Sequence, residues 1–400
     1  MLFKMKKMKT IILILLTSLL SFNIYSQTGR YPGLYSQDYD EIFEALDQII
    51  DNHDREAIEI LHSLILDQTP YIQLNYLKTL SNLKDEEILT FTNEFIDRAE
   101  GFEMHEYREN PLEMKVEAAK IMIQNGDFST VEYFFEYFDL YKPELNLLQR
   151  DILILFPVIA SNVPSALNQI KIGLLYVFYN STISENRFFA LNTFKEIFVD
   201  SVLYLAITGI TDDDYSIRNL SLDFLVEYKY QNLNNVLKDR LLVDPGRSMR
   251  TEIVHYLLEE FGAPSDLKFV IDYNPKETHP TSKSLIGFYI QKFIPPKPAS
   301  LNWSGLITKL LSYTDEMFQY GWIQNEEARD YYIQKLNAVK ESVENNNATA
   351  EACTIINEQL LPKAKQGLKE KLITTEGYKF LHYYTIYIKE EIEKEFGLCD

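Results

Sequence analysis

The chain has 400 residues, 46% of them hydrophobic, and its 59 acidic against 39 basic residues give a formal net charge of −20. This hydrophobic content is enough to bury a core and excludes a disordered chain. The carboxylate excess repels nucleic-acid backbones, so we expect no nucleic-acid partner and a preference for cationic partners.

The first 26 residues have the pattern of a secretory signal peptide. Four lysines precede the apolar run IILILLTSLL, and the segment ends at the small residue Ser26. The run is shorter than the about 20 residues of a membrane-spanning helix, although retention as an N-terminal anchor is the alternative. We predict an exported protein, periplasmic or extracellular, with no transmembrane segment in the mature chain. Without the leader, 35 basic residues minus 59 acidic ones leave a net charge of −24.

After a short N-terminal lead at 27–37, apolar residues recur at three- and four-residue spacing, which predicts an all-α protein. The clearest example is a helical stripe within residues 217–228, followed by a second stripe at 233–241. The breaker Asp244-Pro245-Gly246 ends the second stripe. We therefore expect a helical hairpin of about 30 residues here.

The hairpin recurs along residues 38–292. Basic residues near the predicted start of a helix lie at spacings of 35, 37, 31 and 32, at Lys115, Arg150, Arg187, Arg218 and Arg250. Such periods are typical of stacked two-helix repeats, in which neighbours share one continuous core. The fold predicted for this region is therefore an α-solenoid. We expect the 27 Tyr and 24 Phe to fill gaps between its layers; the alternative is an exposed aromatic stripe that binds glycans or peptides.

Two segments of this region resemble a known repeat family. The run from Asp212 to Arg218, followed by Leu220 and Leu225, resembles the first helix of a HEAT repeat. Residues 111–138, with Gly126-Asp127 as the turn between helices, resemble a whole repeat. The resemblance covers residues 38–290 and implies a HEAT-like α-solenoid that offers a long surface to partners.

Residues 293–299, FIPPKPA, contain three prolines and predict an extended proline-rich linker. Beyond it, residues 300–400 predict a small helical bundle, with helices at about 303–319, 325–345, 349–371 (kinked at Pro362) and 375–395. Gly305-Leu306-Ile307, the turn at 320–325, Lys335 to Ala338 and the break at 345–347 resemble the FIMAH-type domain of exported bacterial proteins. That resemblance implies an appended helical module without a known catalytic role.

The aspartates Asp212, Asp213 and Asp214 are the most conspicuous candidates for chemistry. We expect them to begin a helix, where carboxylates accept backbone N–H groups and face the positive helix end. A calcium loop would need alternating oxygen ligands, a glycine and a terminal glutamate, which this stretch lacks. The six histidines occur singly, and His105-Glu106 lacks the second histidine of a zinc motif. The sequence therefore predicts no catalytic, cofactor-binding or metal-binding residues.

Two further features concern the last hundred residues. An exported protein can join Cys353 and Cys399 in a disulfide, but two unpaired thiols remain an equal alternative. Lysines concentrate at positions 363, 365, 369 and 371. We expect a solvated helix face there; the alternatives are contacts with anionic lipid, polysaccharide or an acidic solenoid.

Together these features predict a non-catalytic exported scaffold that binds a protein or peptide, of cationic character, through a solenoid surface. One alternative is an enzyme or enzyme accessory acting on envelope or extracellular polymers. Another is a structural component of the envelope. The sequence leaves the oligomeric state open.

Overall fold

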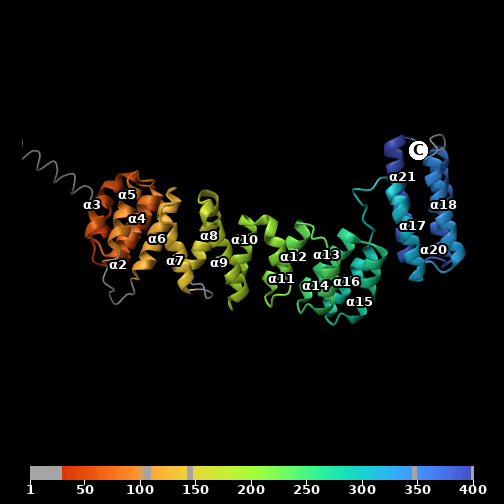
Figure 1. Ribbon diagram of the computed structural model, residues 1–400, viewed down its shortest axis with the longest axis horizontal. Coiled ribbons are helices and arrows are strands. Elements are labelled where there is room, and N and C mark those ends of the chain that lie inside the picture. The colour runs from red at the N-terminus through yellow and green to blue at the C-terminus, as the bar shows by residue number, and fades with distance from the viewer. Residues whose placement is uncertain (1–28, 100, 102–109, 142–146, 345–348, 398–400) are drawn as a thin grey trace, which may run out of the picture. The chain divides into compact units, whose positions relative to one another are not determined.

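The computed structural model describes residues 29–99, 101, 110–141, 147–344 and 349–397 (Figure 1). Helices provide the regular structure of this part of the chain, in which no strand occurs and the antiparallel bridge between Ile323 and Ile373 stands alone. The predicted all-α class is confirmed, and the succession of helices is compatible with a helical solenoid. The predicted signal peptide at 1–26 lies outside the described residues.

The chain divides into two compact units, residues 1–221 and 222–400, and helix α12 (Tyr215–Glu227) crosses the boundary. The predicted limits at 292 and 299 stay a prediction. The other helices of the first unit are α2 (Tyr39–Asp51), α3 (Ile58–Leu64), α4 (Pro70–Asn82), α5 (Ile88–Ala99), α6 (Pro111–Gln124), α7 (Val131–Tyr141), α8 (Leu147–Asn162), α9 (Leu167–Asn180), α10 (Ser184–Ile197) and α11 (Val202–Gly209).

The second unit contains helices α13 to α21 and two π-helical turns, at Leu257–Phe261 and Ile355–Leu360. The α-helices are α13 (Leu233–Val243), α14 (Arg247–Tyr256), α15 (Pro264–Tyr273), α16 (Pro280–Lys292), α17 (Trp303–Gln319), α18 (Glu326–Glu344), α19 (Thr349–Thr354), α20 (Leu361–Lys369) and α21 (Thr375–Phe396). The two helical stripes predicted within residues 217–228 and at 233–241 are therefore confirmed as the helices α12 and α13.

Many helices begin at a residue whose side chain suits a helix start. The carboxylate of Asp38 accepts the Asp40 N–H at the start of α2, and the Asn110 side chain accepts the Leu112 N–H at the start of α6. Proline occupies the first position of α4, α6, α15 and α16, where its missing N–H costs no intrahelical bond. The helix boundaries therefore follow from local sequence chemistry.

Phenylalanine fills the interior between helices, as expected. In the first unit Phe138 of α7 and Phe156 of α8 are buried, with ring centroids 5.5 Å apart. A Cβ at Gly173 of α9 would lie 3.0 Å from the Phe138 ring, so α9 approaches closely because this position lacks a side chain. Among the described residues Phe288 is the one exposed phenylalanine. The core-filling role is thus confirmed for phenylalanine.

The four helical segments predicted after the proline-rich segment are confirmed as α17, α18, the stretch from α19 to α20, and α21 (Figure 1). The interruption predicted at Pro362 takes the form of the π-helical turn at Ile355–Leu360, which ends just before it. Proline lacks an N–H and crowds the carbonyl four residues earlier, so a wider turn accommodates it.

Helix α21 holds the proline-rich segment in place. The Lys379 ammonium donates to the Ile290 and Gln291 carbonyls at the end of α16, at 3.0 and 2.8 Å. The Tyr387 hydroxyl donates to the Pro295 carbonyl at 2.8 Å, and Phe293 and Pro295 are buried. Residues 293–298 are therefore non-helical, as predicted, but they are packed against the bundle.

Gly209, the last residue of α11, permits the close approach of α11 and α12. A Cβ at this position would overlap Ser221 Oγ and lie 3.4 Å from the Phe178 ring. We expect Gly209→Ala to lower the free energy of unfolding by about 1–3 kcal/mol, because the added methyl overpacks the contact. Urea titration followed by circular dichroism measures this change.

The matched control removes the atom that the methyl would strike. Ser221 Oγ is buried without a hydrogen-bond partner, so Ser221→Ala alone should change stability by less than about 1 kcal/mol. The double variant that carries both Gly209→Ala and Ser221→Ala should recover most of the stability lost in Gly209→Ala. A combined variant no more stable than Gly209→Ala would show that the overlap is not the cause.

Candidate binding surface

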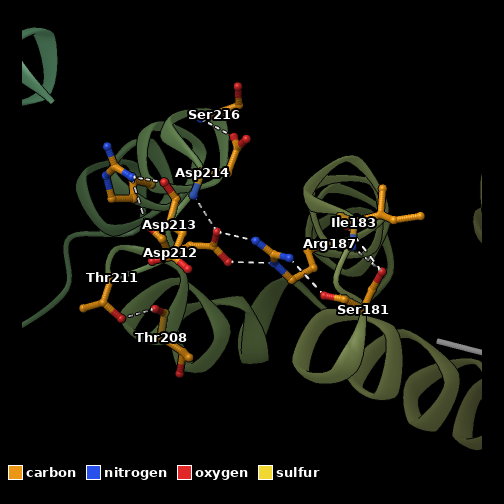
Figure 2. Close-up of polar contacts among 10 residues, drawn as sticks. Ser181, Ile183, Arg187, Thr208, Thr211, Asp212, Asp213, Asp214 and Ser216 are labelled. Carbon is orange, nitrogen blue, oxygen red and sulfur yellow. Dashed lines mark hydrogen bonds and ion pairs between the residues drawn. The ribbon is translucent and has the colours of Figure 1, made fainter. Parts of the chain in front are cut away.

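The loops that precede α10 and α12 are joined by one arginine. Figure 2 shows the Arg187 guanidinium donating to both carboxylate oxygens of Asp212, at 2.9 and 2.7 Å, and to the Ser181 carbonyl at 2.9 Å. The Arg187 and Asp212 side chains are only 15% and 12% exposed. The bidentate geometry therefore fixes one loop relative to the next.

Two of the three aspartates order the start of α12. Asp212 Oδ1 accepts the Asp214 N–H at 2.8 Å, and Asp214 Oδ1 accepts the Ser216 N–H at 2.8 Å (Figure 2). Burial would raise the pKa of Asp214, but hydrogen bonds from Ser216, Ser184 and the Ile217 N–H outweigh it and lower that pKa. The expectation that this run begins a helix is confirmed. Asp213, between them, is exposed.

The same arrangement recurs at other basic residues found in the sequence. Arg218 donates to the Asp212 carbonyl at 2.9 Å, and in the second unit Arg250 donates to the Asp244 carbonyl at 2.8 Å. In each case the acceptor lies six residues before the arginine, as it does in the loop before α10. Each of these three arginines thus closes the loop ahead of its own helix.

Arg250 also forms a buried ion pair with Glu277, at 2.8 and 2.9 Å. The Glu277 carboxylate accepts the Tyr273 hydroxyl at 2.9 Å and the His279 N–H at 2.8 Å. The Arg250 hydrogen bonds outweigh burial and lower the pKa of Glu277 to about 2. Burial and the hydrogen bond to Glu277 raise the pKa of Tyr273 to about 12. The carboxylate is thus held ionised for structural reasons.

A cleft of about 310 Å³ opens beside the Arg187–Asp212 pair. Three exposed tyrosines lie on the helices that border it: Tyr176 and Tyr179 on α9, and Tyr204 on α11, with exposed fractions of 39%, 46% and 71%. Burial is the main cause of the raised pKa of Tyr179, and the nearby Tyr204 raises it further. The cleft is lined by Phe178, Tyr179, Ser181, Arg187, Thr208, Thr211, Asp212 and Asp213.

We call Ile172, Tyr176, Tyr179 and Tyr204 the tyrosine ridge. Ile172, Tyr176 and Tyr179 share the exposed face of α9, since they are four and three residues apart. No motif in the sequence distinguishes these four residues. The available signal was that α9 is apolar on more than one face, with Ile170, Leu174 and Val177 forming the buried stripe.

A second cleft, of about 370 Å³, lies in the second unit. One of its polar groups is His255, whose Nδ1 lies 3.2 Å from a Glu259 carboxylate oxygen. The centroid of the His255 ring lies 5.7 Å from that of the Tyr289 ring. The cleft is lined by His255, Leu258, Glu259, Tyr289, Lys292, Phe293, Ile294 and Pro296. This mixed lining positions no pair of groups for acid–base chemistry beyond the single His–Glu contact.

The histidines in the described residues lie apart from one another. His62 Nε2 lies 2.8 Å from Asp85 and its ring 4.5 Å from that of Phe91, so it packs between helices. His382 stacks on Tyr378, and burial lowers its pKa. Over the described residues no group of three His, Cys, Asp or Glu could hold a metal ion. His105 of the incomplete zinc motif lies outside the described residues.

The remaining predicted features lie in the second unit. Cys353 is buried in α19, but Cys399 lies outside the described residues, so their pairing stays a prediction. Of the basic patch, Lys363 lies over the Tyr331 ring at 5.6 Å, whereas positions 365, 369 and 371 are exposed. Three of these four lysines therefore lie on a solvated face, as expected.

A comparison with models of protein families found no family that matches the chain. A comparison with curated proteins found no similar sequence. None of the helices in the described residues has both the length and the hydropathy needed to cross a bilayer.

Asp212→Asn should lower the free energy of unfolding by about 2 kcal/mol, because the amide cannot form the ion pair and Arg187 stays partly buried. The neighbouring Asp213→Asn is the matched control and should change stability by less than about 0.5 kcal/mol. Chemical denaturation of both variants measures the difference. Equal losses would contradict the structural role of Asp212.

The Glu277 carboxylate should make stability depend on acid pH. Its pKa is about 2 in the folded protein and 4.5 without these contacts, so its contribution is present above pH 4.5 and is lost as the pH falls toward 2. The shift corresponds to about 3 kcal/mol. We expect Glu277→Gln to be less stable at neutral pH and to lose less stability on acidification. Unfolding free energies measured from pH 7 to pH 3 test this.

Proposed function

We propose that the protein is a non-catalytic exported scaffold that binds a protein or peptide partner through the surface of its first unit. In this proposal the hairpins are HEAT-like repeats, and residues 300–400 are a FIMAH-like bundle. The leader-like sequence at 1–26 supports export to the periplasm or the exterior. The observation that carries the proposal is the tyrosine ridge beside a cleft.

The ridge has the composition of a protein-binding surface. Tyrosine is enriched in interfaces because it buries a large apolar ring and still hydrogen-bonds with its hydroxyl. Here three tyrosines and one isoleucine are exposed on neighbouring helices. The ion pair of Arg187 and Asp212 holds the adjacent loop, so the surface is pre-formed and little ordering is needed on binding.

Charge is distributed unevenly between the two units. Residues 27–221 contain 33 acidic and 14 basic residues, a difference of −19, whereas residues 222–400 contain 26 and 21, a difference of −5. The excess of negative charge is thus concentrated in the unit that carries the ridge. Such a field attracts cationic partners and raises their association rate.

The test uses the mature chain, residues 27–400, immobilised and exposed to an extract of the producing cell's envelope. We expect a discrete protein to be retained in a saturable manner by the wild type. Tyr204→Ala, a change at a 71% exposed side chain, should reduce retention about tenfold.

The matched control is Tyr39→Ala on α2, which changes a 45% exposed tyrosine that is distant in sequence from Tyr204. This variant should retain the partner as the wild type does. Circular dichroism establishes that both variants are folded. Failure to retain any protein saturably, or release of fragments from envelope polymers by the wild type, would overturn the scaffold proposal.

A further inference from the structure

The tyrosine ridge and the cleft beside it form one continuous recognition surface. Tyr179 belongs to both, since it lines the cleft and is one of the exposed residues of the ridge. Both lie within the first unit: α9 and α11 supply the ridge, and Arg187 of α10 and the loop before α12 also line the cleft. An occupant must therefore satisfy the apolar ridge and the polar cleft together.

The charges of the cleft are not equally available to an occupant. The Asp212 carboxylate is engaged by Arg187 and by the Asp214 N–H, so the charge of the arginine is already balanced. Asp213 also lines the cleft, and its side chain is exposed. A negative charge on this wall can thus meet an incoming cation.

Aromatic faces add a second attraction for cations. A lysine or arginine over a tyrosine ring is stabilised by the ring quadrupole, and its methylene stem covers apolar surface. The exposed rings of Tyr179 and Tyr204 lie beside the cleft that Asp213 lines. A cationic side chain can therefore use ring and carboxylate together, whereas an acidic one is repelled by both.

Resting on the scaffold function above, we propose that this surface binds a peptide segment in which a lysine or arginine adjoins apolar side chains. The cation lies in the cleft against Asp213 and Tyr179, and the apolar neighbours lie on the ridge. The net −19 of the unit is complementary to such a segment and disfavours acidic or phosphorylated ones.

The direct test is fluorescence anisotropy of the mature chain with a labelled peptide of alternating Lys-Leu pairs and serines. Two control peptides replace every Lys with Glu, or every Leu with Ser. We expect saturable binding of the Lys-Leu peptide, and at least about tenfold weaker binding of each control. Equal binding of the Glu peptide would overturn the proposal, and a neutral chito-oligosaccharide that displaces the Lys-Leu peptide completely would indicate a glycan site instead.

Point variants locate the site on the protein. Tyr204→Ala and Asp213→Asn should each weaken the Lys-Leu peptide, by about tenfold and about threefold. Tyr39→Ala and Asp47→Asn on α2 change an exposed residue of the same type and should have no effect. If Asp47→Asn weakens binding as much as Asp213→Asn, the attraction is a general charge effect and the site is wrong.

The two proposals fail in different ways. If the envelope extract yields a partner that is lost in Tyr204→Ala but the Lys-Leu peptide does not bind, the scaffold function stands and the peptide class is wrong. If no partner is retained and no peptide binds, both proposals are wrong.

Discussion

A guanidinium buried between helices is costly unless its donors are directed at acceptors, and two arginines satisfy this constraint in the same way. In Arg187 and Arg250, one side of the fork binds a carbonyl of the loop before the arginine's own helix, and the other binds a carboxylate of the loop two helices further on. Unpaired, such a charge would destabilise the fold by several kcal/mol. Each of these two arginines therefore joins the loop before its own helix to a later loop of the same unit.

Ion pairs hold two of the loops, whereas the outward faces of some helices carry exposed side chains that are accessible to other molecules. Phenylalanine lies mostly in the interior, whereas tyrosine occurs both in the interior, as at Tyr76 and Tyr137, and on the surface. Phe138 and Phe156 fill the space between helices, whereas Tyr176 and Tyr204 face solvent. The phenol hydroxyl can hydrogen-bond to water, so an exposed tyrosine ring costs less free energy than an exposed phenylalanine ring.

Much of the helical framework could be predicted from the sequence, because stripes, proline breaks and helix-starting aspartates are local signals. The helices after residue 300 match their predicted ranges for this reason. The carboxylate partners could not be predicted: Asp212 lies 25 residues after its arginine and Glu277 lies 27 after its own, among 59 acidic residues. The ridge was also hidden, since tyrosine occurs readily on either face of a helix and only the fold shows that Tyr204 is 71% exposed. The aspartate run was correctly assigned to a helix start because that role depends on neighbours two residues away.

The clamp between α21 and the proline-rich segment bears on how the protein can be divided. Lys379 satisfies the last carbonyls of α16, and α21 covers Phe293, whose ring lies 5.7 Å from that of Phe380. Cutting the chain at residue 299 would leave a helix end without its cation and a bare aromatic ring in water. The newly exposed apolar surface of the shortened protein would bind other molecules non-specifically. Affinities measured with that protein would then include this non-specific binding. Replacement of the terminal bundle by another domain during evolution meets the same restriction, since the new domain must also cover the end of α16.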